Sequence, residues 1–244
     1  MSSTATATQE ELPTDPPLGA LVTANPAAAR VLERFGLDYC CGGQTRLTVA
    51  CLEAGVDPDE VRAAVADLDV ASDVEWADLE PVELIAHILE THHTYLWDEL
   101  PALEALAATV ASVHGQRHPE LIEVGALVAE FRAELEPHMA REERALFPMI
   151  GQLVDGTGPA SAADLESGPI AAMRTEHDHA GDLLARIRQR SSNFELPADA
   201  CASYTSLYQR LEAMENDTHL HVHKENNVLF AAFGFIMKLA PLGA

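Results

Sequence analysis

Two pairs of histidine and glutamate, each four residues apart, have the clearest potential for chemistry. They are His138 with Glu142 and His221 with Glu225. Because residues i and i+4 lie on the same face of a helix, each pair would present an imidazole beside a carboxylate. Imidazole nitrogen and carboxylate oxygen together suit a divalent transition-metal ion. The spacing therefore points to metal binding.

Both pairs interrupt an apolar stripe with helical spacing. One stripe consists of Val124, Val128, Phe131, Leu135, Leu146 and Met149, and the other of Leu207, Leu211, Met214, Thr218 and Val228. A single histidine on such a face is usually an ordinary core residue. A buried glutamate is harder to explain, because an unpaired charge would cost several kcal/mol and neither stripe contains Lys or Arg. A bound cation would supply the missing positive charge.

Two further helical patterns each offer an imidazole on the apolar face. His177 lies in the stripe formed by Ile170, Met173, Leu184 and Ile187. In the stripe formed by Ile85, Leu89, Leu96, Leu100 and Leu103, periodicity leaves His92 and His93 as equal candidates. Distances along the chain place these histidines at matching heights in neighbouring antiparallel helices, except between His177 and His221, where the mismatch is roughly 15 Å. We therefore expect the third helix to continue past Asn193 or the fourth to begin after Pro197.

The elements that must position these residues are helical throughout. Four long helical patterns follow Pro81, separated by loop signals at 114–119, 155–159 and 191–197, which predicts an all-α fold with an up-down four-helix bundle over 81–244. Pro137 lies inside the second helix and would either kink it or be tolerated there. Before the bundle, Asn25-Pro26 and Asp57-Pro58 are helix starts in a small helical module, residues 18–68. Residues 1–17 are expected to be a disordered tail and 69–80 a linker.

The composition excludes several classes of function. The chain has 244 residues and a net charge of −24, so it should repel nucleic acid and anionic membrane surfaces. No segment is long and apolar enough to span a bilayer, and the N-terminus lacks the features of a signal peptide, so a cytoplasmic location is expected. All 11 histidines lie between His87 and His223.

Several motifs together resemble a known family. They are Asp38-Tyr39-Cys40-Cys41-Gly42-Gly43, His138-Met139-Ala140-Arg141-Glu142-Glu143, Leu146-Phe147-Pro148, Glu176-His177-Asp178, and the segment from His221 to Phe230. In this order they resemble the di-iron iron–sulfur cluster repair proteins, which belong to the hemerythrin-like group. The resemblance extends from about residue 18 to 235.

The resemblance implies a specific site and function. The bundle would hold two non-haem iron ions, with an oxo or hydroxo bridge when oxidised, and the ligands would be His93, His138, Glu142, His177, His221 and Glu225, with both glutamates bridging. It thereby selects His93 over His92. The implied function is repair of clusters damaged by oxidative or nitrosative stress, through iron donation to damaged or apo iron–sulfur proteins. Binding or sensing of oxygen or nitric oxide, and reduction of nitric oxide or peroxide, stay open as alternatives, and a homodimer is a candidate assembly.

The cysteines are expected to be free thiols. Cys40 and Cys41 lie between a helix stop at Gly36 and the flexible Gly42-Gly43, so they are either small buried residues or a thiol pair for redox exchange or iron transfer. Cys51 and Cys201 lie on helical stretches and are expected to be structural. The histidines that fall off the stripes or in a loop are expected at the surface or as hydrogen-bond partners of ligands; these are His87, His114, His118, His179, His219 and His223.

Overall fold

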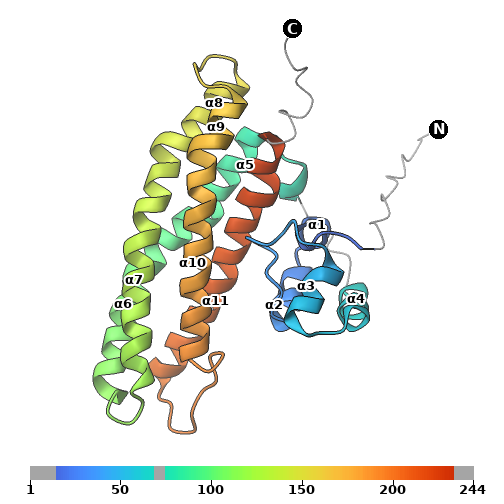
Figure 1. Cartoon of the computed structure of the whole chain (residues 1–244). Coiled ribbons are helices and arrows are strands. Elements are labelled where there is room, and N and C mark those ends of the chain that lie inside the picture. Colours follow the sequence, from blue (N-terminus) through green and yellow to red (C-terminus); the bar gives the residue numbers. More distant parts are fainter. Residues whose placement is uncertain (1–14, 69–74, 234–244) are drawn as a thin grey trace, which may run out of the picture.

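Four long antiparallel helices form the body of the protein, and a group of short helices lies against one side of it (Figure 1). This computed structural model describes residues 15–68 and 75–233. Within those ranges the only strand-like contact is an isolated bridge between Pro17 and Arg46. The all-α, up-down four-helix bundle expected from the sequence is confirmed. Residues 1–14, 69–74 and 234–244, which cover most of the expected tail and part of the expected linker, lie outside the described residues.

Each long helix is interrupted by one π-helical segment. The first comprises α5 (Pro81–Ile88), η2 (Leu89–His93) and α6 (Thr94–His114), and the second α7 (Glu120–Arg141), η3 (Glu142–Leu146) and α8 (Phe147–Val154). The third comprises α9 (Ala162–Leu165), η4 (Glu166–Ile170) and α10 (Ala171–Arg190), and the fourth α11 (Ala202–His223) and η5 (Lys224–Leu229). π-Helical turns are rare and are found mostly at functional sites.

The π-helical segments change which residues face the core. The expected stripes included Leu89, Met149 and Val228, but these three are only half-buried. Their neighbours Ile88, Ile150 and Leu229 are buried instead, with exposures of 0%, 0% and 1%. A π turn adds a residue to the helical repeat, so the apolar face continues one position away from where a period of 3.6 places it.

Two apolar clusters fill the bundle, one on either side of a polar layer. One cluster joins α6, α7, α10 and α11 and includes Leu100, Phe131, Leu184 and Leu211. The other lies toward α5 and α8 and includes Ile88, Phe147, Ile170 and Phe230. The candidate ligands lie between these clusters in every long helix, so apolar side chains shield them on both sides.

The connection between the third and fourth helices reduces the expected mismatch in height. α10 ends at Arg190, and α11 begins at Ala202, after the expected position at Pro197. Ser192, Asn193 and Phe194 all have positive φ angles, and Phe194 is buried against the bundle. The later start of α11 shortens the path from the loop to His221.

α7 continues through Pro137 without a break, so this proline is tolerated.

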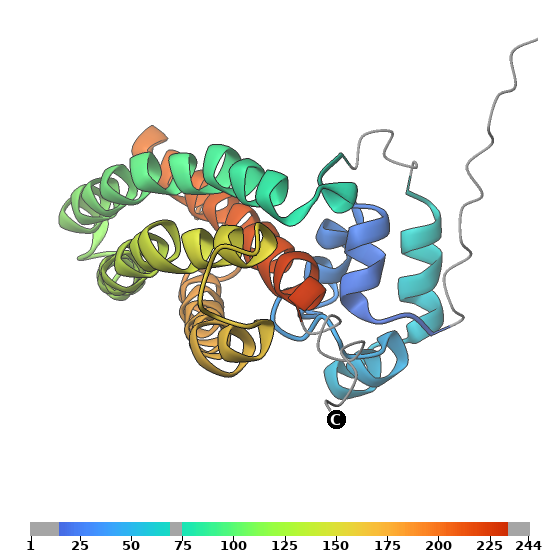
Figure 2. The same cartoon turned by 90° about the horizontal axis from the view of Figure 1, so that it is seen from above.

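The short helices before the bundle are α1 (Leu18–Ala24), α2 (Ala28–Arg34), α3 (Leu47–Ala54) and α4 (Pro58–Ala66). They share an apolar cluster that also takes in Val222 and Leu220 of α11. Viewed from above, they lie beside the fourth long helix (Figure 2). We call residues 18–68 the N-terminal module.

Some residues expected in the tail and linker are packed against the rest of the chain. Asp15 bonds to the side chain and backbone of Thr48, and Leu47 donates its N–H to the Pro16 carbonyl. Trp76, in the expected linker, is buried in the second bundle cluster. Among the described helices, none combines the length and the apolar character that crossing a membrane requires.

Candidate metal centre

The six residues expected as ligands converge in the polar layer between the two apolar clusters. They form two overlapping groups with ligand atoms within 4.8 Å of one another: His93 and His221 with both glutamates, and His138 and His177 with both glutamates. His92, the alternative to His93, belongs to neither group. All six residues are at most 3% exposed. We call this arrangement the His/Glu centre.

The imidazoles are arranged as two pairs. The Nε2 atoms of His93 and His221 are 3.2 Å apart, and those of His138 and His177 are 3.1 Å apart. Two nitrogen ligands about 2.1 Å from one ion would be roughly 3.0 to 3.4 Å apart at octahedral or tetrahedral angles. Each pair therefore has the separation that two ligands of one metal ion require.

Each glutamate reaches both imidazole pairs. Glu142 places Oε1 3.3 Å from Nε2 of His138 and Oε2 3.5 Å from Nε2 of His93. Glu225 places Oε1 2.9 Å from Nε2 of His221 and Oε2 3.1 Å from Nε2 of His177. One oxygen of each carboxylate thus faces each pair, so each glutamate could bridge two ions if both pairs held one.

Unsatisfied buried atoms show that a cation fits this centre. Both carboxylate oxygens of Glu142 and Oε2 of Glu225 are buried without a hydrogen-bond donor. A buried carboxylate oxygen without a donor or a cation is costly. Two divalent ions would satisfy these oxygens together with the four converging imidazole nitrogens.

The electrostatics keep the glutamates charged. Burial by itself would lower the pKa of His138, but Glu142 beside it raises that pKa to about 10. Burial and the charge of Glu225 act to raise the pKa of Glu142, but His138 holds it below its ordinary value. Burial also opposes charge on Glu225, yet His221 and His177 hold its pKa well below the usual range. Protons on imidazoles thus balance the carboxylates, and a metal ion can replace those protons.

Three of the four imidazoles are oriented through their outer nitrogen. Nδ1 of His93 lies 2.9 Å from Oε1 of Glu143. Nδ1 of His138 lies 2.7 Å from Oε2 of Glu176, and Nδ1 of His177 lies 3.0 Å from Oδ1 of Asn226. Such partners fix the tautomer and ring orientation of a metal-binding histidine. Nδ1 of His221 is buried without a partner. Helical spacing did not point to these partners, although each lies directly beside a candidate ligand in the sequence.

A second polar network lies next to the centre. Lys224 is 3% exposed, and its Nζ lies 2.7 Å from Nε2 of His92 and 2.9 Å from Nε2 of His87. His92 also bonds through Nδ1 to Asp217, and its ring stacks on that of His221. Burial lowers the pKa of Lys224 to about 8. His92 therefore packs against a candidate ligand and lies outside both groups of converging ligand atoms.

Of the six histidines expected at the surface or as hydrogen-bond partners of ligands, His114 and His223 are buried. Nε2 of His114 lies 3.1 Å from the sulfur of Cys201, and His223 contacts Thr23 and the Tyr39 carbonyl in the N-terminal module. The other four are half-buried or exposed, and His179 pairs with Glu134. Within the described residues, none of the six bonds to a candidate ligand.

Cys40 and Cys41 lie in the loop between α2 and α3, next to the bundle. Their sulfur atoms are 3.9 Å apart and both are free thiols, with Cys40 buried and Cys41 half-buried. The carboxylate of Asp38 accepts hydrogen bonds from the backbone N–H groups of Cys40, Cys41 and Gly42 and so holds the loop. The hydrogen bond between the two thiols, together with burial, raises the pKa of Cys40 well above its ordinary value.

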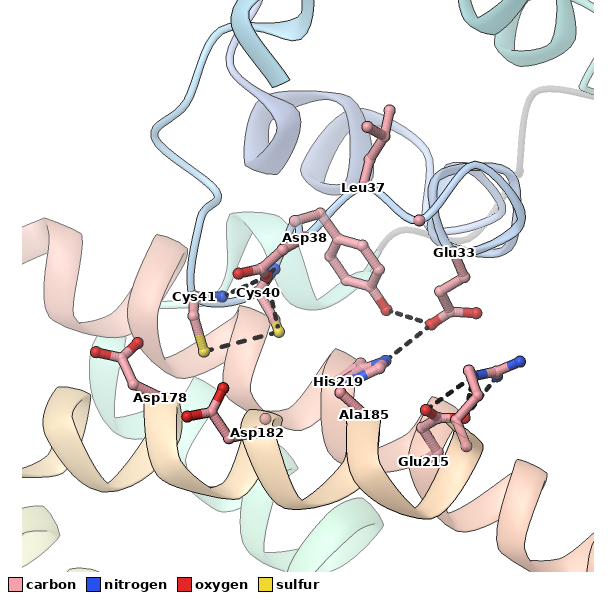
Figure 3. Close-up of a pocket in the computed structure, with 14 residues that line it drawn as sticks. Glu33, Leu37, Asp38, Cys40, Cys41, Asp178, Asp182, Ala185, Glu215 and His219 are labelled. Carbon is pink, nitrogen blue, oxygen red and sulfur yellow. Dashed lines mark hydrogen bonds and ion pairs between the residues drawn. The ribbon is translucent and has the colours of Figure 1, made fainter. Parts of the chain in front are cut away.

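A cavity of about 490 Å³ separates this loop from α10 and α11. Figure 3 shows the two thiols at one side of it, facing Asp178 and Asp182 of α10. Asp38, Cys40 and Cys41 also bring their ligand atoms within 4.8 Å of one another. The loop therefore offers a second, more open set of metal-binding atoms.

Comparisons with known proteins agree with both parts of this description. Residues 84–233 match the family described as Hemerythrin HHE cation binding domain, and residues 14–69 match a domain of unknown function, DUF542. The chain is 36% identical to "Iron-sulfur cluster repair protein YtfE" of Enterobacter sp. (strain 638) over 217 residues, which is 88% of this chain and 95% of that protein. It is 34% identical to "Probable iron-sulfur cluster repair protein" of Haemophilus influenzae, covering 87% of this chain and 94% of the relative.

Proposed function

Because the chain belongs to the family of iron–sulfur cluster repair proteins with a hemerythrin HHE cation-binding domain, we propose that it holds two non-haem iron ions and donates iron to damaged clusters. The observation that carries the proposal is the pair of buried glutamates, each with one oxygen toward each imidazole pair. His93, His138, Glu142, His177, His221 and Glu225 would be the ligands. Bound iron would supply an ion that can change oxidation state and leave.

The donor set favours iron over a structural zinc ion. Zinc sites of the structural kind are closed by thiolates and imidazoles, whereas this centre offers imidazoles and carboxylates only. Carboxylate bridges also exchange more readily than thiolate cages, which suits a centre that must release an ion.

The chain's own residues would act in two places. In the bundle, Glu143 and Glu176 orient the imidazoles, and the apolar clusters restrict water. At the cavity, Cys40 and Cys41 would receive the departing ion or exchange electrons, and Asp178 and Asp182 would attract it by charge. Damaged or apo iron–sulfur proteins are the proposed partners, and a cytoplasmic location belongs to the same proposal.

Metal analysis of protein purified without oxygen tests the centre. We expect about two irons per chain and, after oxidation, the visible absorption of a bridged ferric pair. Zinc alone, or no metal, would overturn the proposal.

Transfer to an apo iron–sulfur protein tests the role of the thiols. A Cys40→Ala/Cys41→Ala double variant should keep its iron but deliver it at least about tenfold more slowly. Cys201→Ala, which changes a thiol at the far end of α11, is the matched control and should deliver at the wild-type rate. Equal delivery by all three proteins would remove the thiols from the mechanism.

A cavity of about 430 Å³ between α7 and α10 favours a second candidate function, binding of oxygen or nitric oxide. His138 and His177 line this cavity along with Pro137 and Thr175, so a small molecule could approach one imidazole pair. This alternative predicts a stable adduct between the reduced protein and the gas, with both irons retained. Loss of iron on exposure to nitric oxide would favour donation instead.

A further inference from the structure

The π-helical segment η5 contacts the His/Glu centre and the Cys40–Cys41 loop at the same time. Glu225 points into the centre, and the next two residues are asparagines directed at the loop. The Nδ2 atoms of Asn226 and Asn227 lie 3.4 and 2.9 Å from the carbonyl oxygen of Cys40. The loop and the centre are therefore separated by single side chains.

Asn226 bridges the two regions, and the chemistry of its partners fixes its orientation. The Cys40 carbonyl can only accept a hydrogen bond, so the NH₂ group of the amide must face it. Oδ1 must then face His177, and it lies 3.0 Å from Nδ1 of that imidazole. Because Oδ1 can only accept, Nδ1 must carry the proton. That leaves Nε2, which points at Glu225 and His138, as the nitrogen available to bind a metal ion.

We propose that Asn226 makes the Cys40–Cys41 loop a supporting part of the metal position formed by His138 and His177, so that metal binding and loop order are coupled. In one direction, the docked loop holds His177 in the metal-binding tautomer. In the other, a cation on Nε2 strengthens the Nδ1–H donor and so tightens the connection through Asn226 to the loop. Linkage requires the two effects to be equal in free energy.

The coupling belongs to one metal position only. The outer nitrogens of His93 and His138 are held by carboxylates that come from the bundle itself, Glu143 and Glu176. His177 is held by a neutral amide whose other end is fixed by the N-terminal module. The position formed by His93 and His221 has no such connection, so its affinity should not depend on the loop. The inference rests on the metal-binding part of the proposed function and not on iron delivery.

Asn227 provides a matched control. Its amide bonds to the same Cys40 carbonyl, to the Tyr39 carbonyl and to Gln44. Among the bonds described for it, none reaches a candidate ligand. Replacing Asn227 therefore loosens the loop without touching His177, whereas replacing Asn226 affects both.

The test uses Mn²⁺ under anaerobic conditions, because this ion prefers oxygen and nitrogen ligands and has little affinity for thiols. The affinity of each position is measured by titration, and the maleimide labelling rate of Cys41 is measured by peptide mass spectrometry with and without Mn²⁺. Cys201, about 30 Å along α11 from His221, is the internal reference. In the wild type we expect two bound ions and labelling of Cys41 slowed about fivefold or more by Mn²⁺.

Three variants separate the parts of the proposal. Asn226→Ala should weaken one of the two positions by about tenfold or more and make labelling independent of Mn²⁺. Asn226→Asp still accepts from His177 but has no N–H for Cys40, so it should retain both ions and lose the effect of Mn²⁺ on labelling. In Asn227→Ala, maleimide should label Cys41 faster than in the wild type, and Mn²⁺ should still slow that labelling. The affinities of both metal positions should stay within about threefold of the wild type.

Two results would overturn the coupling alone. One is wild-type affinity at both positions in Asn226→Ala, and the other is a wild-type labelling rate that Mn²⁺ does not change. A wild-type chain that binds neither Mn²⁺ nor Fe²⁺ would overturn the metal centre as well, so the two failures are distinguishable. Asn226→Asp keeps the test decisive if Asn226→Ala does not fold.

Discussion

The His/Glu centre and the Cys40–Cys41 loop both offer metal-binding atoms, but they are built in opposite ways. The centre takes side chains from four long helices, buries them almost completely and places apolar clusters on both sides. The loop takes its donors from one short segment, organises them through the carboxylate of Asp38 and leaves Cys41 partly open to a cavity.

Under the proposed function, this difference would let one chain both hold and release an ion. The centre takes its ligands from four packed helices, so its side chains have little freedom to lose at binding and affinity can be high. The loop is held by a few hydrogen bonds at an accessible edge, so its donors can exchange partners. Under the proposed function, the first arrangement suits retention and the second suits transfer.

The largest effect is expected from removing a bridging carboxylate. Glu225→Ala should reduce the bound metal from two ions per chain to at most one, because this side chain faces both imidazole pairs. Metal analysis after gel filtration measures the loss. The Cys40→Ala/Cys41→Ala variant is the contrasting control and should keep two ions. If both variants kept two ions, the centre would not hold metal as described.

Raising the pH should strengthen metal binding at the centre. The pKa of His138 is raised to about 10, so at neutral pH the imidazole keeps a proton that the metal must displace. The apparent affinity should therefore rise about tenfold per pH unit between pH 7 and 9 for this one proton. Mn²⁺ titrations at several pH values measure it, and the double cysteine variant should show the same slope. A flat profile would contradict the charge balance described for the centre.

Weakening the support of one ligand should have a smaller effect. Glu143→Gln removes the carboxylate that accepts from His93 and from Trp97, and it should lower the affinity of one position about 10- to 100-fold. Glu134→Gln, which affects only the exposed pair with His179, is the matched control and should leave both affinities unchanged. Equal behaviour of the two variants would mean that outer partners do not tune the centre.

The smallest effect concerns how the loop packs on η5. A Cβ atom at Gly43 would lie 2.4 Å from Oδ1 of Asn227 and 2.5 Å from the Tyr39 carbonyl. Gly43→Ala should therefore lower the free energy of unfolding by about 1–3 kcal/mol. Gly125→Ala, in α7 with open space around the new Cβ, should instead raise it by about 0.5–1 kcal/mol. Chemical denaturation measures both, and a stable Gly43→Ala protein would show that the loop is not tightly docked.

Sequence patterns predicted the bundle and the location of its polar layer because both depend on helical spacing. Glu142 and Glu225 were identified by a simple energetic argument, since a buried carboxylate without a basic partner needs a cation. The choice of His93 over His92 came from the family resemblance, because both residues are buried and periodicity alone cannot separate them.

Other features depend on contacts that a single helix does not reveal. Ile88, Ile150 and Leu229 replaced the expected core residues because a period of 3.6 cannot show a π turn. His223 is buried because the N-terminal module covers it, and Asn226 meets His177 only when the module docks. Cys201, expected to be structural, is exposed beside buried His114 because a loop ends there.

The π-helical segments have a consequence for how this chain can change in length. Each one is, in effect, an α-helix with a single surplus residue, and removing that residue would restore regular hydrogen bonding. The same deletion would rotate everything beyond it by about 100°, and in η2 it would turn His93, the last residue of that segment, away from the face set by α5. Substitutions in these segments can leave the backbone path intact, whereas any change in residue number cannot. A redesign that improved only helix regularity would produce a more stable bundle that had lost the arrangement of its candidate metal ligands.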